Sequence, residues 1–458
     1  MRDVRRSVFL IGAILILAFF SAYPAFAQTS DAAEARRIAL SERLGKAVAV
    51  IPAQTQSARG SQEGKDFYYL TGAMEAEAVL VLAGEGEKKA TLFNRSGKWS
   101  GPSATILDVR PSTELRMFLA RSTAQRKIYV SFAALEGVLQ AVGGGSVFAQ
   151  AAEIANIDPI LSEMRIVKSP EEIEILKKAI DITADAYIDA LKTAEPGTRE
   201  LDIDAVLQFN YIRRGAEKSF LQVASGPNSV NIHFGSTTRE MKAGDVIVFD
   251  VGAWVERYTS DISRTIPVSG RFTKEQAEIY NVVLEAQKEG IRLMVAGNKI
   301  LDAQTAVEDA LLKGLARLGL VTDPASPWQR RLFIRHGFIH GIGLDVHDVY
   351  NWFSREMRNG LTFKPGMVLT MEPGLYFPEK MLDSAPGGPR AQVKEDEFKA
   401  FASKIGPTFK KYAGMGCRIE DDVLVMETGN QVLTVRAPKE IADIERTMKM
   451  PSSHGPLK

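Results

Sequence analysis

An internal repeat constrains the fold of this chain more than any other feature of its sequence. Residues 242–252 and 364–374 both read Lys-x-Gly, an apolar stretch, an acid, one further residue and a glycine. The acid is Asp250 in the first copy and Glu372 in the second. Short apolar stretches of this kind are typical of buried strands. We therefore expect two pseudo-equivalent halves that each place a carboxylate at the same strand position, with a site between them. The alternative is a chance likeness of two short strands.

Composition limits the chemistry that such a site can use. The 458 residues are 45% hydrophobic and 25% charged, which is typical of a soluble globular protein with one large domain or two ordinary ones. The net charge is only +1, so no basic excess is present and we expect no nucleic-acid partner. Five histidines and one cysteine, Cys417, exclude both a disulfide framework and a thiolate zinc site within one chain. Metal ligands must therefore come from His, Asp and Glu.

The N-terminus has the order of a secretory signal peptide. Three arginines among the first six residues precede an apolar run over residues 8–20, and an Ala-Phe-Ala triplet follows. We predict a signal peptide over residues 1–27, cleavage before Gln28, and export to the periplasm or the medium. The alternative is a retained membrane anchor, since the uncharged stretch over residues 7–30 is just long enough to span a bilayer.

The rest of the chain divides into two domains and a tail. Residues 28–162 alternate short β-rich runs with helical stretches, which predicts a small α/β domain with strands near 47–51, 78–82 and 128–131. The second domain, over residues 163–445, begins where Ser169, Pro170 and Glu172 form a capping box at the start of a helix. Residues 446–458 form a C-terminal tail.

Two acids in the first copy of the repeat suggest a cation site. Asp250 interrupts an apolar strand, where an unpaired charge is costly. We expect a hairpin that turns near residues 255–256 and places Asp261 directly opposite Asp250. Like charges so placed repel, and a divalent ion bound through oxygen ligands would reverse that penalty. The alternative is a pair of acids bridged by Arg264 or Arg257.

Histidines gather in the same part of the sequence. His336, His340 and His347 lie within one glycine-broken stretch, and His233 also belongs to the second domain. A single histidine is usually a satisfied core residue, but three in a loop whose glycines let the backbone approach a site indicate a functional cluster. The acidic triplet that begins at Glu420 opens a further strand and is a candidate for the same site.

These residues together resemble the pita-bread metallopeptidases, and specifically the aminopeptidase P and prolidase branch, which cleaves beside proline. The resemblance covers essentially the whole chain after residue 27. Its motifs are Tyr69-Leu70-Thr71-Gly72, Ser225-Gly226-Pro227-Asn228 with His233, Asp250-Val251-Gly252, Ser260-Asp261-Ile262-Ser263-Arg264-Thr265, the histidine loop, Glu372-Pro373-Gly374 and Gly416-Cys417-Arg418-Ile419-Glu420-Asp421. It implies an α/β N-terminal domain and an α+β pita-bread (creatinase/aminopeptidase-like) catalytic domain with two pseudo-equivalent halves.

The resemblance also implies a ligand set and a cofactor. Two divalent metal ions per chain would be held by five residues, all of which are present: Asp250, Asp261, His340, Glu372 and Glu420. Oxygen-rich ligands favour manganese, with cobalt or zinc as substitutes. Serine at position 263, where the family usually has threonine, should change little. The separation of 48 positions from Glu372 to Glu420 is longer than we expect for compact aminopeptidases, so altered access to the site is expected.

Roles follow from the same resemblance. Glu372 would act as general base, and His233 and His347 would donate hydrogen bonds to the developing oxyanion. His336 and Arg418 would position the substrate. The expected function is an exported Xaa-Pro aminopeptidase that acts on proline-containing peptides, as a homo-oligomer of two or four subunits. The alternatives are a strict Xaa-Pro dipeptidase and a catalytically inactive binding protein on the same fold, and the complete ligand set disfavours the latter.

Overall fold

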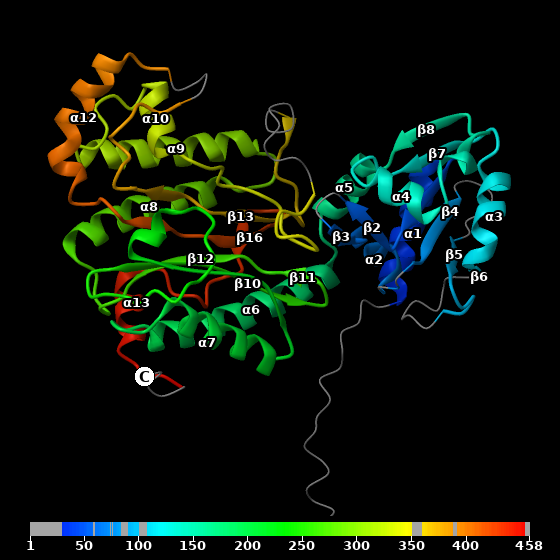
Figure 1. Cartoon of the computed structure of the whole chain (residues 1–458), viewed down its shortest axis with the longest axis horizontal. Coiled ribbons are helices and arrows are strands. Elements are labelled where there is room, and N and C mark those ends of the chain that lie inside the picture. The colour runs from blue at the N-terminus through cyan, green and yellow to red at the C-terminus, as the bar shows by residue number, and fades with distance from the viewer. Residues whose placement is uncertain are drawn as a thin grey trace, which may run out of the picture. The chain divides into compact units, whose positions relative to one another are not determined.

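The structure of the chain is a computed structural model. It describes residues 30–57, 60–73, 75, 77–83, 90–99, 108–349, 360–387 and 392–453. The expected signal peptide over residues 1–27 and the C-terminal His454 lie outside the described residues. Across the helices that are described, none has both the length and the apolar character that a membrane span requires. The chain forms two compact units, over residues 1–155 and 156–458 (Figure 1).

The smaller unit is built on a six-stranded mixed sheet, and the three predicted strands are confirmed within it. Strand order is β6-β5-β4-β1-β7-β8, with β1 antiparallel to β4 and parallel to β7. Alternate residues of the central strands, such as Val48, Val50, Val79 and Val81, enter one apolar core. Bounds are α1 (Ser30–Leu44), β1 (Val48–Pro52), β2 (Gln54–Ser57), β3 (Gly60–Glu63), α2 (Lys65–Thr71), β4 (Val79–Ala83), β5 (Ala90–Asn94), β6 (Asp108–Pro111), α3 (Leu115–Ser122), β7 (Lys127–Val130), α4 (Leu135–Ala141) and β8 (Glu153–Asn156).

The larger unit places its strands between two pairs of helices. In Figure 1, α6 and α7 lie on one side of the strands and α8 and α9 on the other. Bounds are α5 (Asp158–Ile166), α6 (Pro170–Thr193), α7 (Glu200–Arg213), β9 (Glu217–Ser225), the short 3₁₀ helix η3 (Gly226–Val230), β10 (Val246–Val255), β11 (Tyr258–Thr259), β12 (Ile262–Pro267), α8 (Lys274–Leu293), α9 (Ile300–Arg317), α10 (Pro327–Phe333), β13 (Val368–Met371), β14 (Gly374–Tyr376), α12 (Glu395–Phe409), β15 (Gly416–Arg418), β16 (Asp421–Val425), β17 (Asn430–Val432) and α13 (Ile441–Met448).

Helix α6 begins as the sequence predicts. The side chain of Ser169 accepts a hydrogen bond from the backbone of Glu172, the side chain of Glu172 accepts one from the backbone of Ser169, and Pro170 is the first helical residue. Each contact satisfies an N–H group that the first turn leaves without a partner. Helix α8 begins with the same device at Thr273 and Gln276.

The hairpin of β10 and β12 differs from the expected register by two residues. Asp250 lies opposite Ser263, and not opposite Asp261. The reason is the turn, which falls at Glu256 and Arg257, both with positive φ (47° and 66°), one residue later than expected. Side chains alternate between the two faces with a period of two, so a shift of two residues keeps Asp250 and Asp261 on one face.

The repeat in the sequence corresponds to a repeat in backbone geometry. Gly244 precedes β10 with a φ of 91°, and Gly366 precedes β13 with a φ of 84°. A side chain is strained in this left-handed region, so the glycine of each Lys-x-Gly motif is required by the turn that starts the strand. Each of these strands leads to an acid of the candidate site, Asp250 within β10 and Glu372 directly after β13.

The helix pairs repeat in the same way. Gly197 joins α6 to α7 with a φ of 91°, and Gly297 joins α8 to α9 with a φ of 89°. The N–H of Gly197 donates to the carbonyl of Met241 at 2.8 Å, and the N–H of Gly297 donates to the carbonyl of Phe363 at 2.9 Å. The two pseudo-equivalent halves are therefore present, and the larger unit has the expected α+β fold.

The described parts of the segment between Glu372 and Glu420 belong to this unit. Strands β14 and β15 pair with each other, and α12 lies between them in sequence. The charged residues 394–397 form the N-cap and first turn of α12. Acidic side chains are favourable there because the helix dipole is positive at that end.

Candidate metal centre

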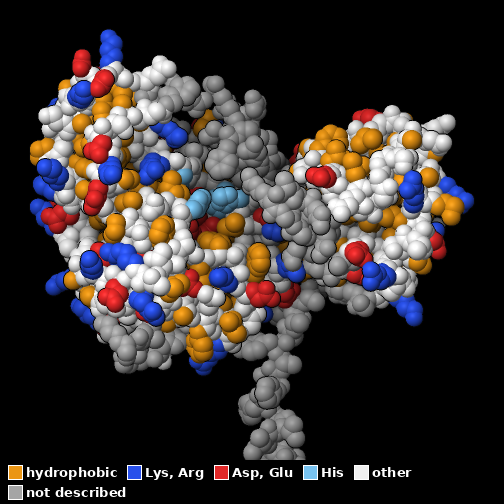
Figure 2. Space-filling model, in the orientation of Figure 1, with side chains coloured by type: hydrophobic (Ala, Val, Ile, Leu, Met, Phe, Trp, Pro, Cys, Tyr) orange, Lys and Arg blue, Asp and Glu red, His pale blue; other side chains and the backbone are white. Residues whose placement is uncertain are grey.

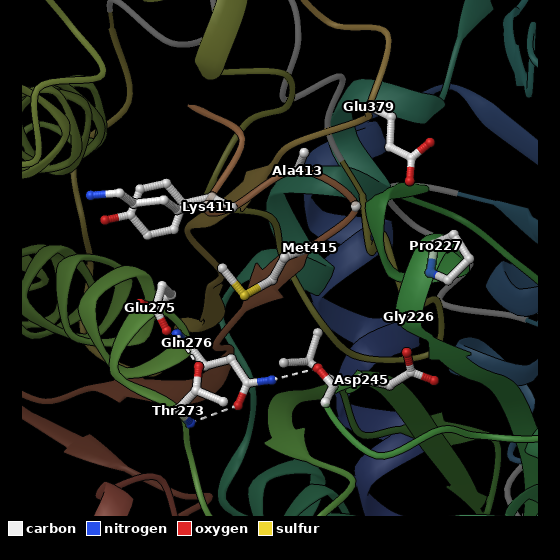
Figure 3. A pocket seen from close by; sticks show the side chains of 14 residues that line it. Gly226, Pro227, Asp245, Thr273, Glu275, Gln276, Glu379, Lys411, Ala413 and Met415 are labelled. Carbon is white, nitrogen blue, oxygen red and sulfur yellow. Dashed lines mark hydrogen bonds between the residues drawn. The ribbon is translucent and has the colours of Figure 1, made fainter. Parts of the chain in front are cut away.

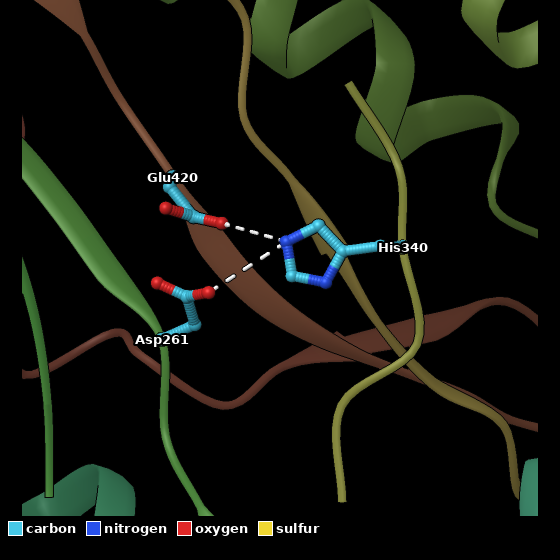
Figure 4. A group of neighbouring side chains, drawn as sticks. All are labelled: Asp261, His340 and Glu420. Carbon is cyan, nitrogen blue, oxygen red and sulfur yellow. Dashed lines mark ion pairs between the residues drawn. The ribbon is translucent and has the colours of Figure 1, made fainter. Parts of the chain in front are cut away.

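Three of the five predicted ligands meet in one buried cluster. Ligand atoms of Asp261, His340 and Glu420 lie within 4.8 Å of one another, and Figure 4 shows the three side chains converging. The Nε2 atom of His340 lies 3.6 Å from Oδ2 of Asp261 and 3.6 Å from Oε1 of Glu420. Asp261 lies between β11 and β12, Glu420 between β15 and β16, and His340 in the loop after α10. The cluster thus joins segments that are distant in the sequence.

The other two predicted ligands contact this cluster. Oε1 of Glu372 lies 3.4 Å from Nε2 of His340. Asp250 is linked to Glu420 through the hydroxyl of Ser263, which lies 2.7 Å from Oε2 of Glu420 and 3.3 Å from Oδ1 of Asp250. All five side chains therefore belong to one connected site.

Burial and neighbouring charges shift the pKa values of the acids and of His340 in this site. Burial raises the pKa of Glu372 to about 8, and the charge of Glu420 adds to the effect. Burial, with Glu420 and Asp250 as neighbours, also raises the pKa of Asp261 well above its ordinary value. Burial alone would lower the pKa of His340, but Glu420 and Glu372 outweigh it and raise this pKa to about 9. A group of carboxylates that stabilises a proton or a cation so strongly has the electrostatics of a cation site.

Unpaired oxygens test whether a metal fits. Among the described residues, Oδ1 of Asp261, Oε1 of Glu420 and Oδ1 of Asp422 are buried and have no hydrogen-bond partner. Buried carboxylate oxygens are normally paired, since an unsatisfied one is costly. Two of the three belong to predicted ligands, and the donor set of carboxylates and one imidazole suits a divalent ion. The residues present therefore fit a metal.

One alternative from the sequence was that Arg264 bridges Asp250 and Asp261, and the structure does not show this bridge. Arg264 donates to Asp421 at 2.7 Å, and Lys439 contacts the other oxygen of Asp421. This pairing lowers the pKa of Asp421 despite its burial, and it includes the side chain of none of the five predicted ligands. Asp250 instead pairs with Arg418.

Arg418 and two unpredicted side chains form one wall of the site. Arg418 donates to the hydroxyl of Tyr376 at 2.8 Å and to Oγ of Ser263 at 2.9 Å. The hydroxyl of Tyr376 also lies 3.1 Å from Nε2 of His336. Tyr376 was not among the residues predicted from the sequence. The available signal was its spacing, because it lies four residues after Glu372 in the strand that follows the repeat.

The remaining histidines surround the cluster. Nδ1 of His336 lies 3.7 Å from Oε2 of Glu372, and the ring of His347 lies 4.2 Å, centre to centre, from that of His340. Burial, with the charge of Arg418 as the next cause, lowers the pKa of His336 to about 4. Burial, with the charge of His340, lowers the pKa of His347 to about 4 as well. Both rings are therefore neutral near pH 7.

His233 is exposed, as is His347. His233 lies in the loop after η3 and interacts electrostatically with Asp250, His336 and His347, so it belongs to the same site. Figure 2 shows histidine side chains gathered in a hollow of the larger unit.

A second cavity, of about 440 Å³, lies elsewhere in the larger unit (Figure 3). Its described lining includes none of the predicted site residues. Thr273, Gln276, Glu379, Lys411 and Met415 contribute to it, together with Gly226 and Pro227 of η3. The polar groups of Thr273 and Gln276 are already engaged in capping α8. The cavity is therefore distinct from the metal centre.

Comparisons with known proteins agree with this geometry. The sequence pattern of metallopeptidase family M24 matches residues 174–427, and that of the aminopeptidase P N-terminal domain matches residues 33–116. The Xaa-Pro aminopeptidase of Escherichia coli is 33% identical over 455 residues, which cover 90% of this chain and 96% of the relative. The Xaa-Pro aminopeptidase of Haemophilus influenzae is 35% identical and covers 83% and 87% of the two chains.

A solved structure agrees at the level of the fold. The zinc-substituted E. coli aminopeptidase P in complex with product superposes with a TM-score of 0.74 at 32% identity, over 92% of this chain and 98% of that one. The chain therefore belongs to metallopeptidase family M24, the metal-dependent peptide hydrolases, and within it to the aminopeptidase P branch.

Proposed function

We propose that this protein is a dinuclear-metal Xaa-Pro aminopeptidase, which removes the first residue of peptides whose second residue is proline. One observation carries the proposal: the convergence of Asp261, His340 and Glu420, with unpaired carboxylate oxygens, in a chain that Xaa-Pro aminopeptidases match along most of its length. The matching relatives support an aminopeptidase over a strict dipeptidase. The complete ligand set argues against an inactive binding protein.

The ligand assignment extends the observed cluster to two ions. Asp250, Asp261, His340, Glu372 and Glu420 would together hold both. Oxygen-rich sites suit manganese, and a relative has been obtained with zinc, so we propose Mn²⁺ with Zn²⁺ or Co²⁺ as substitutes. Such a pair supplies a nucleophilic water at neutral pH and polarises the scissile carbonyl.

The residues of the chain would divide the remaining work. Glu372, whose pKa is raised by burial, would accept the proton of the attacking water and pass it to the leaving prolyl nitrogen. The imidazole rings of His347 and His233 would donate hydrogen bonds to the developing oxyanion. One well-placed donor contributes about 3 kcal/mol. His336 and Arg418, tied together by Tyr376, would position the peptide.

Two further parts of the proposal concern the whole protein. Export to the periplasm or the medium is supported by the arginines, apolar run and Ala-Phe-Ala triplet of residues 1–27. Assembly into a dimer or tetramer is supported by the family resemblance alone. The domain limits that we propose are 28–162 and 163–445, with a tail over 446–458.

The test is a chelation and restoration assay. Purified protein is stripped with a chelator, and Mn²⁺ is then returned while cleavage of Ala-Pro-Ala, Ala-Pro and Ala-Ala-Ala is followed. We expect activity on Ala-Pro-Ala that disappears on stripping and returns with Mn²⁺, and little activity on Ala-Ala-Ala. Asp261→Ala should lose activity and metal, whereas Glu275→Ala, which changes an acid outside the centre, should keep both.

Each contrary outcome selects another function. Cleavage of Ala-Pro without Ala-Pro-Ala would identify a dipeptidase. Metal binding without hydrolysis of any of the three peptides would identify a binding protein. Hydrolysis that survives complete stripping, or an Asp261→Ala protein that still holds two metal ions, would overturn the site assignment.

A further inference from the structure

A buried carboxylate outside the metal centre has an unusually complete set of partners. Glu200, in the first turn of α7, is fully buried. Its Oε1 accepts hydrogen bonds from the N–H of Ser225 at 2.7 Å, the hydroxyl of Ser225 at 2.7 Å and Nδ2 of Asn228 at 2.9 Å. Its Oε2 accepts from the N–H of Thr237 at 3.0 Å and from the hydroxyl of Thr237 at 2.5 Å. One side chain therefore satisfies five donors.

Those donors lie at the two ends of one loop. Ser225 ends β9 and Asn228 lies in η3, whereas Thr237 lies at the far end of the irregular segment that follows. His233 lies between them. The carboxylate of Glu200 thus joins the beginning and the end of the segment that carries His233, and it fixes backbone as well as side-chain groups. A loop held at both ends by a buried group loses most of its conformational freedom.

Two further contacts support the same loop. Arg239, just after it, donates to the hydroxyl of Ser225 at 2.7 Å and to Asp245 at 2.8 Å. The N–H of Phe234, next to His233, donates to Oε1 of Gln222 at 2.6 Å, and Gln222 lies directly opposite Asp250 in the sheet. The backbone beside His233 is therefore tied to the strand pair that carries a predicted metal ligand.

The pseudo-equivalent half shows that the fold itself does not require this carboxylate. The N–H of Glu200 donates to the carbonyl of Arg239 at 3.1 Å, three residues after Gly197. In the second half, the N–H of Ile300 donates to the carbonyl of Leu361 at 3.1 Å, three residues after Gly297. Ile300, which is buried and apolar, therefore occupies the position of Glu200. A carboxylate occurs only in the half whose loop carries His233.

We propose that Glu200 is a positioning residue, which holds the His233 imidazole in place over the metal centre by fixing both ends of its loop. The inference rests on the proposed function only for the catalytic role of His233. The positioning of its loop by Glu200 does not depend on that function. The hydrogen bonds of the Glu200 carboxylate go to Ser225, Asn228 and Thr237, and none of these is a predicted metal ligand. Glu200 acts through the loop.

The first test is spectroscopic and uses the full-length, metal-free protein. Glu200→Gln keeps the size of the side chain but turns one acceptor oxygen into a donor, which then faces N–H and O–H donors. With only five histidines in the chain, ¹⁵N-histidine spectra are readable, and His233→Ala identifies the His233 signals. We expect Glu200→Gln to shift or broaden the His233 signals and to leave those of His340 in place.

A matched control separates this effect from a general loss of stability. Glu172 is also buried in the first turn of a helix, and it accepts from the N–H of Ser169 at 2.9 Å and from the hydroxyl of Tyr258 at 2.8 Å, away from the His233 loop. Glu172→Gln should leave the His233 signals unchanged. If Glu200→Gln does not fold, Thr237→Val removes a single hydroxyl donor from Glu200 and serves in its place. Unchanged His233 signals in a folded variant would overturn the proposal.

The second test is a double-mutant cycle on the manganese enzyme with Ala-Pro-Ala. A displacement of about 1 Å at a catalytic group can cost on the order of 10²-fold in rate, so Glu200→Gln should lower kcat/KM by up to that factor. If the loss acts through His233, adding Glu200→Gln to His233→Ala should cost nothing further. Glu172→Gln should keep the wild-type kcat/KM. An equal loss in both backgrounds would overturn the proposal. If the wild-type protein cleaves no prolyl peptide, the proposed function fails. The spectra of the metal-free protein still decide whether Glu200 holds His233 in place.

Discussion

At the scale of single residues, the hydroxyl of Ser263 decides how the predicted ligands are held. It lies between carboxylate oxygens of Glu420 and Asp250 and accepts a hydrogen bond from Arg418. A hydroxyl has one proton to donate, so it can satisfy only one carboxylate at a time. Groups that orient metal ligands in this way commonly change metal affinity 10- to 100-fold when they are removed.

Ser263→Ala should therefore weaken the binding of metal without unfolding the protein. We expect a loss of affinity for Mn²⁺ on the order of 10- to 100-fold, measured by titration calorimetry on the stripped protein. Ser263→Thr keeps the hydroxyl, and threonine is usual here in the resembling family, so this variant should bind as the wild type does. Equal affinities for all three proteins would show that Ser263 does not orient the ligands.

The identities of the candidate ligands could be predicted from sequence, but their contacts could not. Asp250 and Glu372 were indicated by the repeat, Asp261 by the expected hairpin, and His340 and Glu420 by the clusters in which they lie; the family resemblance then joined them into one ligand set. Ser263 was noted only as a substitution, and Tyr376 was not noted, because neither lies in a pattern that a strand period or a charge cluster reveals. Their importance comes from Arg418, which donates to Ser263 in β12 and to Tyr376 in β14, two contacts between distant segments that no local pattern specifies.

At the scale of elements, the histidine loop is fixed to the segment that precedes α6. Asp348, which is buried, accepts from Nζ of Lys168 at 2.8 Å and from Arg165 at 2.5 Å. Gly343 lies against this group, and a Cβ at that position would lie 2.3 Å from Oδ2 of Asp348. The loop that carries His340 and His347 can therefore close on Asp348 only with glycine at position 343.

The ion pairs of Asp348 predict a pH dependence of stability. Burial alone would raise the pKa of Asp348, but Arg165 and Lys168 outweigh it and lower this pKa below its ordinary value. A lowered pKa in the folded state means that the ionised group stabilises the fold above the unfolded pKa of about 3.9, and that this contribution is lost as the pH falls through the folded value. Asp348→Asn should lower the unfolding free energy by about 3–5 kcal/mol at pH 7, and by less at pH 3.

Urea unfolding of the wild type and of Asp348→Asn at pH 7, 4 and 3 measures this difference. Asp181→Asn is the control, because Asp181 pairs with Arg436 at an exposed site, where a pair contributes less than about 1 kcal/mol. A difference between wild type and Asp348→Asn that is as large at pH 3 as at pH 7 would contradict the assignment of the effect to this carboxyl.

Elements were predictable where a local device specifies them. The capping box at Ser169 was correct, because its two hydrogen bonds lie within one turn. The hairpin register was wrong by two residues, because its turn uses Glu256 and Arg257 with positive φ, which neither residue type signals. The shared face of Asp250 and Asp261 survived this error because a shift of two residues preserves the face.

At the scale of the whole molecule, the larger unit is two copies of one arrangement with different side chains. The glycines at 197 and 297, and at 244 and 366, set equivalent turns in the two halves. Equivalent strands then bring Asp250 and Glu372 to the same site from opposite halves. The sequence repeat predicted this arrangement because left-handed turns and strand starts need fixed residue types. The repeat of the helix pairs was not predicted, since apart from Gly197 and Gly297 their residues share little.

The division into two units makes a prediction about stabilisation by metal. A ligand that binds only the folded state raises the unfolding free energy by about 2.7 kcal/mol at a hundred times its dissociation constant. The candidate ligands all belong to residues 156–458, and the smaller unit has an apolar core of its own. Scanning calorimetry of the full chain should therefore show a transition of the larger unit that rises with Mn²⁺ concentration, while a transition of the smaller unit stays in place. Asp261→Ala removes a candidate ligand and should abolish the rise. If the rise persists in Asp261→Ala, the stabilising ion binds elsewhere, because that variant lacks the carboxylate of Asp261.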